Sequence, residues 1–410
     1  MAAPQASSPF EKILIVGAGP AGLLLALLLS QQNIPSVVLE SWPCLDTRLR
    51  AVQYGVPATR VFRRAKVLED IRRISIPKFP TICWRSVADL EKIIEIDLSL
   101  TESEVDRMTV LPLGEIIQIL YRHCLDHANG LIEVKFNHKV TDVGQNESTA
   151  WVDVELEDKS TERITAPYVV GCDGASSAVR RALFGRHWPG ETFPYRFVVQ
   201  QLFYDGFEKH GWDGGNYMID PDHWGLIARR GNGGLWRVTY GDGLTGLTDE
   251  EYLQRRPAHL KAMLPGHPDP DQYTIESTNL YRIHNRCADK FRVGRVILAG
   301  DAAHICNPMG GYGAMSAILD VEGLVDCFIG YYHNKAGPEI LDIYAKVRRD
   351  IFLRYVDTRS RKNLDRVAHT DPKTALEKDG FFRLLATLQK DEKSMKDFLM
   401  GDGVDVIALV

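Results

Sequence analysis

Hydrophobic residues at the start of the chain fall into short runs separated by glycine and polar residues. Residues 12–16 form an apolar run with β-branched members, which is typical of a buried parallel strand. A helix is expected to begin near Pro20, because proline is favoured in the first turn of a helix. Residues 36–39 form a second apolar run, and Glu40 ends it. The chain therefore begins with a predicted strand, glycine-rich turn, helix and strand.

The second quarter of the chain mixes helical and strand-like periodicity. Residues 110–130 are expected to form a helix and residues 131–140 a strand. Residues 151–156 alternate between apolar and polar, as a half-buried strand does. A hairpin partner is expected through Ile164, and residues 168–170 form another apolar run.

Residues 192–283 have a different pattern, in which short apolar runs are separated by Gly, Pro and Asp. The strands predicted there are 197–203, 217–219, 224–228 and 235–240. A mostly antiparallel sheet fits this pattern, and residues 76–100 are expected to join it. From Met315 to the end the pattern is helical, with amphipathic stretches near 338–365 and 374–398.

Length and composition agree with a globular α/β protein. At 410 residues, two intertwined domains are expected rather than one small core. Hydrophobic residues make up 45% of the chain and charged residues 25%, both ordinary values. The net charge of −5 does not indicate the excess of basic residues that is typical of nucleic-acid-binding proteins.

The cysteines and the apolar segments indicate in which cellular compartment the protein is expected. The seven cysteines are scattered and lack Cys-x-x-Cys spacing, so we expect free thiols in a reducing, cytoplasmic compartment and neither disulfides nor a metal site. The apolar run Ile13–Leu29 is interrupted by Gly-Ala-Gly-Pro-Ala-Gly, and a strand with a buried helix explains it better than a signal peptide or membrane helix. No other segment is long enough to span a bilayer.

The glycine-rich turn predicts a dinucleotide site. Gly17 permits a tight turn, Gly19 lets the backbone approach a pyrophosphate, and Gly22 lets helix and strand pack closely. The N–H groups at the start of the following helix favour an anion. Glu40 can accept hydrogen bonds from a ribose diol and would repel a 2′-phosphate, so the tightly bound cofactor is FAD or NAD.

Two later fragments decide between these cofactors by resemblance. They are Gly171-Cys172-Asp173-Gly174-Ala175-Ser176-Ser177-Ala178-Val179-Arg180, and Arg295-Val296-Ile297-Leu298-Ala299-Gly300-Asp301-Ala302-Ala303-His304 with Pro308 and Gly310-Gly311 after it. In this order and spacing, the three fragments resemble the flavoprotein aromatic hydroxylases of the para-hydroxybenzoate hydroxylase class. The resemblance spans roughly residues 10–360 and implies FAD.

The resemblance also implies roles for residues. Asp173, Gly174 and Arg180 match a stretch near the pyrophosphate and the nicotinamide approach. Gly300 and Asp301 match a Gly-Asp pair whose Asp lies against the ribitol. The loop from Pro308 through Gly310, Gly311 and Gly313 to Ala314 would lead into a helix start beside the flavin ring, where N–H groups stabilise the reduced, anionic ring. Arg48 and Arg50 match an Arg-x-Arg-Ala stretch beside the flavin, although Arg48 is equally well explained as a solvated loop cation.

The chain departs from the resemblance at two places. Most relatives have Gly-Gln-Gly-x-Asn after the proline, whereas this chain has Gly311-Tyr312-Gly313-Ala314-Met315. Relatives often carry Arg or Gln at the start of the helix near residue 113, where this chain has Leu-Gly. That polar contact to FAD is therefore expected to be either missing or supplied by Gln118 or Arg122. His304 is expected to be a structural histidine bonded to the backbone.

The expected fold is therefore α/β: a Rossmann-like FAD-binding domain of the GR2 type with an inserted, mostly antiparallel substrate sheet and a helical C-terminus. The FAD-binding domain is expected in three parts, 1–75, 110–190 and 284–365. The substrate domain takes 76–109 and 191–283, and 366–410 forms the C-terminal helical segment. The third domain of the longer relatives is not expected.

The resemblance implies an NAD(P)H- and O2-dependent monooxygenase that hydroxylates an aromatic or polyketide-like small molecule through a C4a-hydroperoxyflavin. NADPH or NADH would bind transiently, since the chain has no second dinucleotide motif. Gln201, Tyr217 and Arg229 are the predicted substrate-site residues, and Trp224 and Trp236 are expected in the core.

Two alternatives stay open. One keeps FAD but changes the outcome to epoxidation, oxidative decarboxylation, dearomatisation or cyclisation, and the other is a flavin carrier without turnover. The oligomeric state, monomer or homodimer, is open as well.

Overall fold

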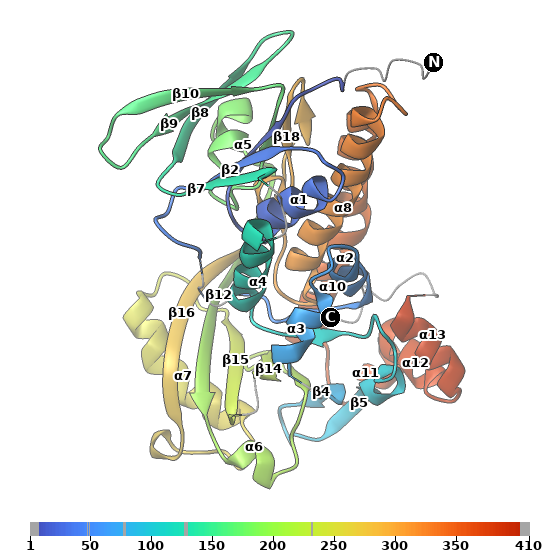
Figure 1. Ribbon diagram of the computed structural model, residues 1–410. Helices are drawn as coiled ribbons and strands as arrows, with labels where there is room; N and C mark the ends of the chain where they lie inside the picture. The colour runs from blue at the N-terminus through green and yellow to red at the C-terminus, as the bar shows by residue number, and fades with distance from the viewer. Residues whose placement is uncertain are drawn as a thin grey trace.

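The computed structural model describes residues 8–46, 48, 50–76, 79–126, 130–230 and 233–401. Its first layer is a six-stranded sheet in the order β17-β18-β11-β1-β2-β7 (Figure 1). Five of these strands run parallel and β17 is antiparallel to β18. Their bounds are β1 Ile13–Val16, β2 Ser36–Leu39, β7 Ile132–Lys135, β11 Tyr168–Gly171, β17 Arg292–Val293 and β18 Val296–Leu298. The predicted apolar runs therefore form parallel strands buried on both faces.

Helix α1 (Pro20–Ser30) begins where the glycine-rich turn ends. All of its residues after Pro20 are buried, because it packs between α4 (Leu113–Asp126) and α8 (Tyr312–Tyr332). A helix that is apolar all round is stable only when it is enclosed in this way. An antiparallel meander of β8 (Lys139–Gln145), β9 (Ala150–Glu155) and β10 (Thr161–Ala166) lies beside this layer, with α5 (Ala178–Phe184) packed on β8.

The second layer is an eight-stranded sheet in the order β19-β16-β12-β15-β14-β13-β4-β5. Every neighbouring pair is antiparallel except β13 with β4, which is parallel. The strands are β4 Thr81–Ser86, β5 Lys92–Asp97, β12 Gly190–Phe203, β13 Gly215–Ile219, β14 Gly225–Arg229, β15 Leu235–Asp242, β16 Thr274–Cys287 and β19 His304–Ile305. Strands β4 and β5, from the segment that the sequence assigns to this sheet, join the mostly antiparallel sheet as predicted.

The two faces of this sheet bury different cores. One face, here called the inner face, packs Phe197, Tyr217 and Ile283 with Met309 and residues of the C-terminal helices. The outer face packs Trp236 and its neighbours against α6 (Gly206–Lys209) and α7 (Asp249–Met263). Sequence analysis did not predict α7, although its Thr248–Glu251 capping box is a readable start signal.

The C-terminal part is helical, as predicted. Helix α9 (Ile340–Ile351) continues through a π-helical turn (Phe352–Val356) into α10 (Asp357–His369), which packs on β13. Helices α11 (Ala375–Lys378), α12 (Gly380–Leu388) and α13 (Glu392–Met400) lie beside β4 and β5 (Figure 1). The remaining elements are α2 Val56–Arg64, α3 Leu68–Ile74, the two-stranded pair β3 Gln53–Tyr54 and β6 Thr109–Val110, and the 3-10 turns Leu98–Thr101, Pro270–Gln272 and Gly300–Ala302.

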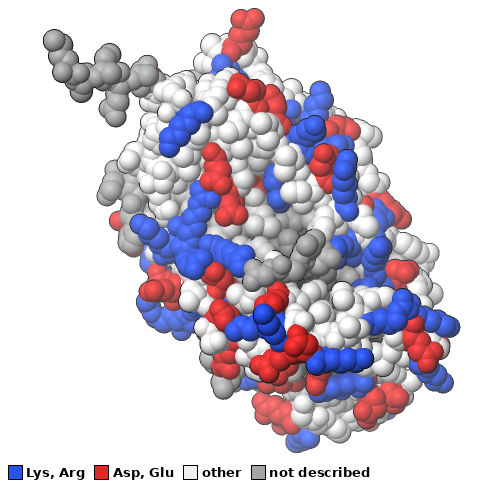
Figure 2. Space-filling model, turned by 90° about the vertical axis from the view of Figure 1, so that its right-hand side faces the viewer, with Lys and Arg blue, Asp and Glu red and all other residues white. Residues whose placement is uncertain are grey.

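The state of the cysteines and the distribution of surface charge can be read from the structure. All seven cysteines are free thiols. Figure 2 shows acidic and basic side chains interspersed over the face drawn, in keeping with the small net charge. Within the described ranges, no helix is long and apolar enough to cross a membrane, and no group of three or more His, Cys, Asp or Glu side chains could hold a metal ion.

Candidate active site

The three sequence fragments meet at one edge of the parallel sheet. Strands β1, β11 and β18 are neighbours, so their carboxyl ends lie together. The carbonyl of Val16 accepts a hydrogen bond from the Cys172 N–H at 2.8 Å, and the carbonyl of Gly171 accepts one from the Ala299 N–H at 3.0 Å. In open α/β sheets, this edge is where ligands bind.

The glycines of the first fragment lie in different local surroundings, which explain why glycine stands at each position. Gly17 has φ +104°, and a Cβ there would lie 2.6 Å from the carbonyl oxygen of Cys172. At Gly22 a Cβ would lie 1.9 Å from the Gly17 carbonyl oxygen. Gly19 has no atom within 4 Å of its Cβ position. Chain packing therefore requires Gly17 and Gly22, whereas Gly19 faces open space in which a ligand can approach the backbone.

Glu40 lies directly beside this turn. Its Oε2 accepts a hydrogen bond from the Ala18 N–H at 2.8 Å, and its Oε1 accepts one from the Trp42 N–H at 2.9 Å. Oε1 also accepts a hydrogen bond from the Ser41 hydroxyl at 3.0 Å. The carboxylate is thereby held at the carboxyl ends of β1 and β2, and Oε2 keeps a further lone pair for a hydroxyl donor.

Asp173 and Arg180 connect the second fragment to its surroundings. Asp173 caps α5, since its carboxylate accepts hydrogen bonds from the Ser177 hydroxyl at 2.6 Å and the Ala178 N–H at 2.6 Å. Burial raises the pKa of Asp173, and these hydrogen bonds oppose the rise. The Arg180 guanidinium donates to the Ala302 carbonyl at 3.0 Å, which ties the second fragment to the third.

Gly300 in the third fragment is held by a buried ionic network. The fully buried Asp320 on α8 accepts hydrogen bonds from the Gly300 N–H at 3.0 Å and from Arg348 Nε at 2.7 Å. His304 Nε2 lies 2.7 Å from the same carboxylate. Burial would raise the pKa of Asp320, but the charges of His304 and Arg348 more than offset this and hold it below its ordinary value. His304 is structural, as expected, but its partner is this carboxylate and not the backbone.

Asp301 follows with a carboxylate that accepts no hydrogen bond from the described part of the chain. Burial raises its pKa, and the nearby charges of His304 and Arg50 lower it. Arg50 itself donates to Asp46 at 2.8 Å. Arg48 also pairs with Asp46, and its side chain is 59% exposed. Arg50 is therefore the closer of the two arginines to Asp301.

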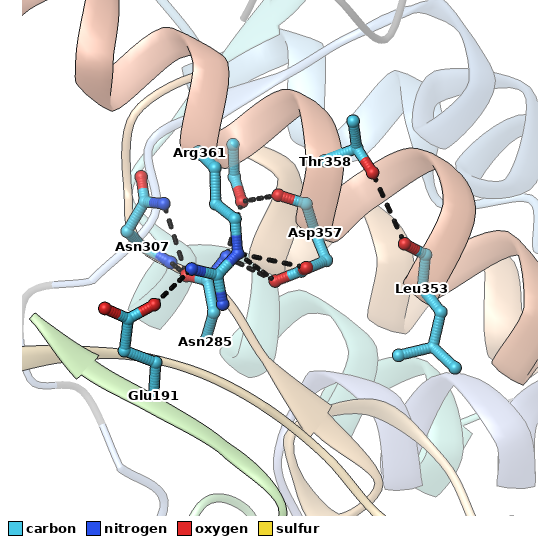
Figure 3. A network of polar contacts seen from close by, with 8 residues as sticks. Glu191, Asn285, Asn307, Leu353, Asp357, Thr358 and Arg361 are labelled. Carbon is cyan, nitrogen blue, oxygen red and sulfur yellow. Dashed lines mark hydrogen bonds and ion pairs between the residues drawn. The ribbon is translucent and has the colours of Figure 1, made fainter.

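The loop after the third fragment is fastened by the polar network in Figure 3. Asn285 on β16 accepts hydrogen bonds from the Asn307 N–H at 2.7 Å and from its side-chain amide at 3.2 Å. The Asn285 amide donates to Asp357 at 2.7 Å and to Ser360 at 2.9 Å, both on α10. Asn307 then accepts from the Met309 N–H at 3.0 Å. Sheet and helix together fix the start of the loop.

The rest of this loop leads into α8. Gly310 and Gly311 have φ +100° and +66°, a region that disfavours side chains, and Gly311 is the N-cap of α8 without a side-chain cap. Gly313 has no atom within 4 Å of its Cβ position. Pro308 and Ala314 are half-buried on either side. The first N–H groups of α8 are thus available at an open surface of the backbone.

Strand register decides which predicted substrate-site residues face this loop. Gln201 pairs with Arg237 and Tyr217 pairs with Leu226, and both pairs lie on the inner face. The Tyr217 hydroxyl hydrogen-bonds to the Gly310 backbone, and its ring stacks on Trp84 at 5.4 Å. Gln201 donates to Glu276 at 2.9 Å.

Arg229 does not lie with them. It pairs in register with Trp236 on the outer face, and its guanidinium contacts Asp213 at 3.1 Å. Its neighbour Arg230 and the cross-strand Arg237 take the inner face instead. Trp224 and Trp236 are each only 2% exposed, so both are core residues as expected. Gln118 and Arg122 lie on the exposed side of α4.

Comparison with known proteins identifies the class. Residues 11–359 match the FAD binding domain family. The chain is 36% identical to para-nitrophenol 4-monooxygenase of Pseudomonas sp. (strain WBC-3) over 393 residues, which cover 95% of this chain and 94% of that protein. It is 30% identical to 6-hydroxy-3-succinoylpyridine 3-monooxygenase HspB of Pseudomonas putida (strain DSM 28022 / S16), covering 95% and 96% of the two chains.

A solved structure supports the same conclusion. The crystal structure of p-nitrophenol 4-monooxygenase PnpA from Pseudomonas putida DLL-E4 superposes with a TM-score of 0.87 at 33% identity, covering 97% of this chain and 98% of that one. The chain therefore belongs to the FAD-dependent aromatic hydroxylases and is a flavin-dependent monooxygenase.

FAD is the cofactor of this family, and the geometry of the described residues fits it. Gly19 and Gly313 leave open space beside the backbone, and Asp301 presents a half-buried carboxylate that accepts no hydrogen bond from the described part of the chain. These features leave room for the pyrophosphate and ring and supply an acceptor for ribitol hydroxyls.

Proposed function

We propose that this protein uses NADH or NADPH and O2 to hydroxylate a phenol or a related hydroxylated heteroaromatic ring. The names of the two relatives, one for a nitrophenol and one for a hydroxypyridine, support this substrate class over a polyketide-like one. The observation that carries the proposal is the meeting of Tyr217, on the inner face of the sheet, with Gly310 in the loop after the Gly-Asp motif.

Bound FAD would accept electrons from the nicotinamide and activate O2 for transfer of one oxygen atom to the aromatic ring. We assign the adenosine and pyrophosphate to Gly17, Gly19, Gly22 and Glu40. The ribitol is assigned to Gly300 and Asp301, and the ring to the loop Pro308–Ala314. Arg48, Arg50 and Asp173 complete the proposed cofactor residues, and Arg50 is favoured over Arg48 by its position near Asp301.

We also propose that the two sheets correspond to two domains. The strands of the six-stranded sheet lie in segments 1–75, 110–190 and 284–365, as a GR2-type FAD domain would require. Most strands of the eight-stranded sheet lie in 76–109 and 191–283. β12 begins at Gly190, β16 ends at Cys287, and β19 lies within 284–365.

Tyr217 acts in this proposal as a hydrogen-bonding residue and not as a base. Burial raises its pKa to about 12, despite the opposing effect of the Gly310 hydrogen bond, so the phenol stays protonated at neutral pH. Apolar side chains beside it, including Phe197 and Trp84, keep water from the reacting ring. Gln201 lies on the same face and is held by Glu276.

The test is a coupled assay with the FAD-loaded enzyme. Substituted phenols and hydroxypyridines are screened while NAD(P)H oxidation, peroxide release and product are followed together. We expect at least one ring compound to stimulate NAD(P)H oxidation, and one oxygen atom from ¹⁸O2 to enter the product. Turnover without ¹⁸O in the product would favour another flavin-dependent outcome, and no stimulation by any aromatic would contradict the proposal.

A further inference from the structure

A cluster of titratable side chains lies on the outer face of the eight-stranded sheet, opposite the face that carries Tyr217. Helix α7 covers this outer face, and its buried residues are Tyr252, His259, Leu260 and Met263 (Figure 1). Among these four, histidine is the residue type that takes up a proton near neutral pH. His259 is 2% exposed, so its protonation depends on the groups that it contacts.

Both ring nitrogens of His259 have a partner. Nε2 lies 3.2 Å from the carboxylate of Asp242, the last residue of β15. Nδ1 lies 3.1 Å from Nδ1 of His223, in the turn 220–224 between β13 and β14. The Tyr240 ring of β15 stacks on the His259 imidazole at 4.3 Å. The imidazole therefore joins α7 to a strand and to a turn that are distant from it along the chain.

Asp242 is ionised and accepts hydrogen bonds from several groups. Arg255 Nε of α7 donates to it at 2.7 Å, and the Leu244 N–H donates at 3.0 Å. Burial would raise the pKa of Asp242, but these two contacts and the neighbouring His259 hold it below its ordinary value. Because an ionised carboxylate only accepts hydrogen bonds, His259 Nε2 must carry a proton.

Further charged or titratable groups lie around the pair of histidines. They are Tyr240 with Arg256 close to it, and Asp220 and Asp222 in the turn. Burial raises the pKa of Tyr240, so this phenol stays neutral. The Asp220 carboxylate accepts hydrogen bonds from the N–H groups of Asp222 and His223, both at 2.8 Å. Asp220 therefore holds the backbone of His223 in place.

The two hydrogen bonds of His259 determine where protons can bind. With Nε2 donating to Asp242, a neutral His259 has its lone pair on Nδ1, so His223 must donate from its own Nδ1. A first added proton can bind Nε2 of the half-buried His223 and leave both hydrogen bonds intact. A second proton must bind Nδ1 of His259, where two N–H groups and two positive rings would then face each other across 3.1 Å.

We propose that His223 and His259 form a proton-operated latch, which fastens α7 to the turn 220–224 while at most one of the two rings is charged and releases it when both are. Burial lowers the pKa of His259 in the closed form, and His223 lowers it further, against the opposing effect of Asp242. When α7 opens, the ring enters water and its pKa returns to about 6.5. Acid therefore favours the open form.

The two elements that the latch joins are suited to such a change. Pro257 lies inside α7, two residues before His259, and a proline removes one helical hydrogen bond. The second half of α7 therefore depends on the contacts of its buried face. On the other side, the turn continues directly into Trp224, which belongs to the same apolar core as Tyr217. Release of α7 would free a turn that borders the inner face of the sheet.

The experiment is hydrogen–deuterium exchange of the FAD-loaded protein between pH 7.5 and 5.5, measured by mass spectrometry. Protection factors, corrected for the pH dependence of free amides, are compared for α7, for the turn 220–224 and for α1 as an internal reference. His259→Gln and His223→Gln each replace a titrating ring by a neutral amide. His267→Gln is the matched control, because His267 is an exposed histidine just beyond α7 that contacts the Lys261 carbonyl.

We expect the protection of α7 in the wild type to fall about 5- to 10-fold from pH 7.5 to 5.5, because His259 titrates near pH 6.5 in the open form and lower in the closed form. The stabilising effect of a neutral His259 is complete above this pH and is lost as the pH falls. Asp242, whose pKa is also lowered, contributes a loss only below about pH 4, outside this range.

The variants should separate the latch from a general effect of acid. His259→Gln should keep the protection of α7 constant within about 2-fold over the same range, since no titrating ring remains on its buried face. His223→Gln should reduce the fall, because the neighbour that lowers the pKa of His259 is gone. His267→Gln should behave as the wild type, and the protection of α1 should stay constant in every protein.

An unchanged fall in His259→Gln, or no fall in the wild type, would overturn the inference. An equal fall in α1 would also overturn it, because acid would then loosen the whole protein and not α7. If His259→Gln does not fold, His223→Gln decides the question, since its fall must be smaller than that of the wild type. The latch is independent of the proposed function, because no substrate or turnover enters the measurement.

Discussion

At the residue scale, the contacts of a residue show whether it stabilises the fold or is available to bind a ligand. Gly22 prevents a collision within the chain, whereas Gly19 leaves space beside it. Both carboxylate oxygens of Asp173 accept hydrogen bonds at the start of α5, whereas the Asp301 carboxylate accepts no hydrogen bond from the described part of the chain. Asp301 is therefore the better expected ligand of the cofactor, because its half-buried carboxylate keeps its lone pairs for other donors.

Glu40 and Asp301 supply the residue-scale prediction. Glu40→Ala and Asp301→Ala should each weaken FAD binding by about 1–3 kcal/mol, the cost of leaving buried polar partners unmatched. Fluorescence titration of the apoprotein with FAD measures the change. Glu133→Ala, an exposed carboxylate on the neighbouring β7, is the control and should bind FAD normally. Full flavin retention by both site variants after dilution and gel filtration would show that these carboxylates do not hold the cofactor.

At the element scale, the glycine-rich loop before α8 is positioned by elements that are distant in sequence. Asn285 on β16, which donates to Asp357 on α10, holds Asn307 (Figure 3), and Asp320 on α8 holds Gly300. The loop itself is rich in glycine and cannot fix its own conformation. Its geometry therefore depends on the docking of α8 and α10 against the sheets.

Asn285 provides the element-scale prediction. Asn285→Ala leaves the Asn307 N–H without an acceptor and removes one donor from the Asp357 carboxylate, which keeps its contact with Arg361. We therefore expect FAD affinity to fall by about 1–3 kcal/mol. The flavin absorbance of the bound state should also shift, because the loop lies beside the proposed ring position. Asn279→Ala, at an exposed position on the same strand, is the control. Equal FAD affinity in the two variants would show that the network stabilises α10 alone.

At the scale of the whole molecule, the proposed active site is formed where the two sheets meet. The parallel sheet contributes the three fragments, and the inner face of the second sheet contributes Tyr217. The family match and the similar solved structure span both sheets. Cofactor binding and substrate binding should therefore depend on the complete chain.

The whole-molecule prediction concerns how FAD is held. The purified protein should be yellow, and acid precipitation should release FAD into the supernatant, because the proposed contacts are hydrogen bonds and backbone approach. The absorbance spectrum of the supernatant checks this. Flavin that stays in the pellet would indicate a covalent bond, and a colourless protein that FAD cannot reconstitute would contradict the assignment of the site.

The sequence by itself determined the first strand, turn, helix and second strand, the membership of residues 76–100 in the second sheet and the convergence of the three fragments. Local signals suffice for the strand, turn and helix, since glycine spacing and apolar runs specify backbone shape over a few residues. The convergence of the three fragments was predicted from the family resemblance. Only the tertiary structure decided that Arg230 and Arg237, and not Arg229, face the loop. It also decided that His304 bonds to Asp320, and that β13 pairs in parallel with β4. Those outcomes depend on strand register and on partners far along the chain, and a shift of one residue in register exchanges the two faces of a strand.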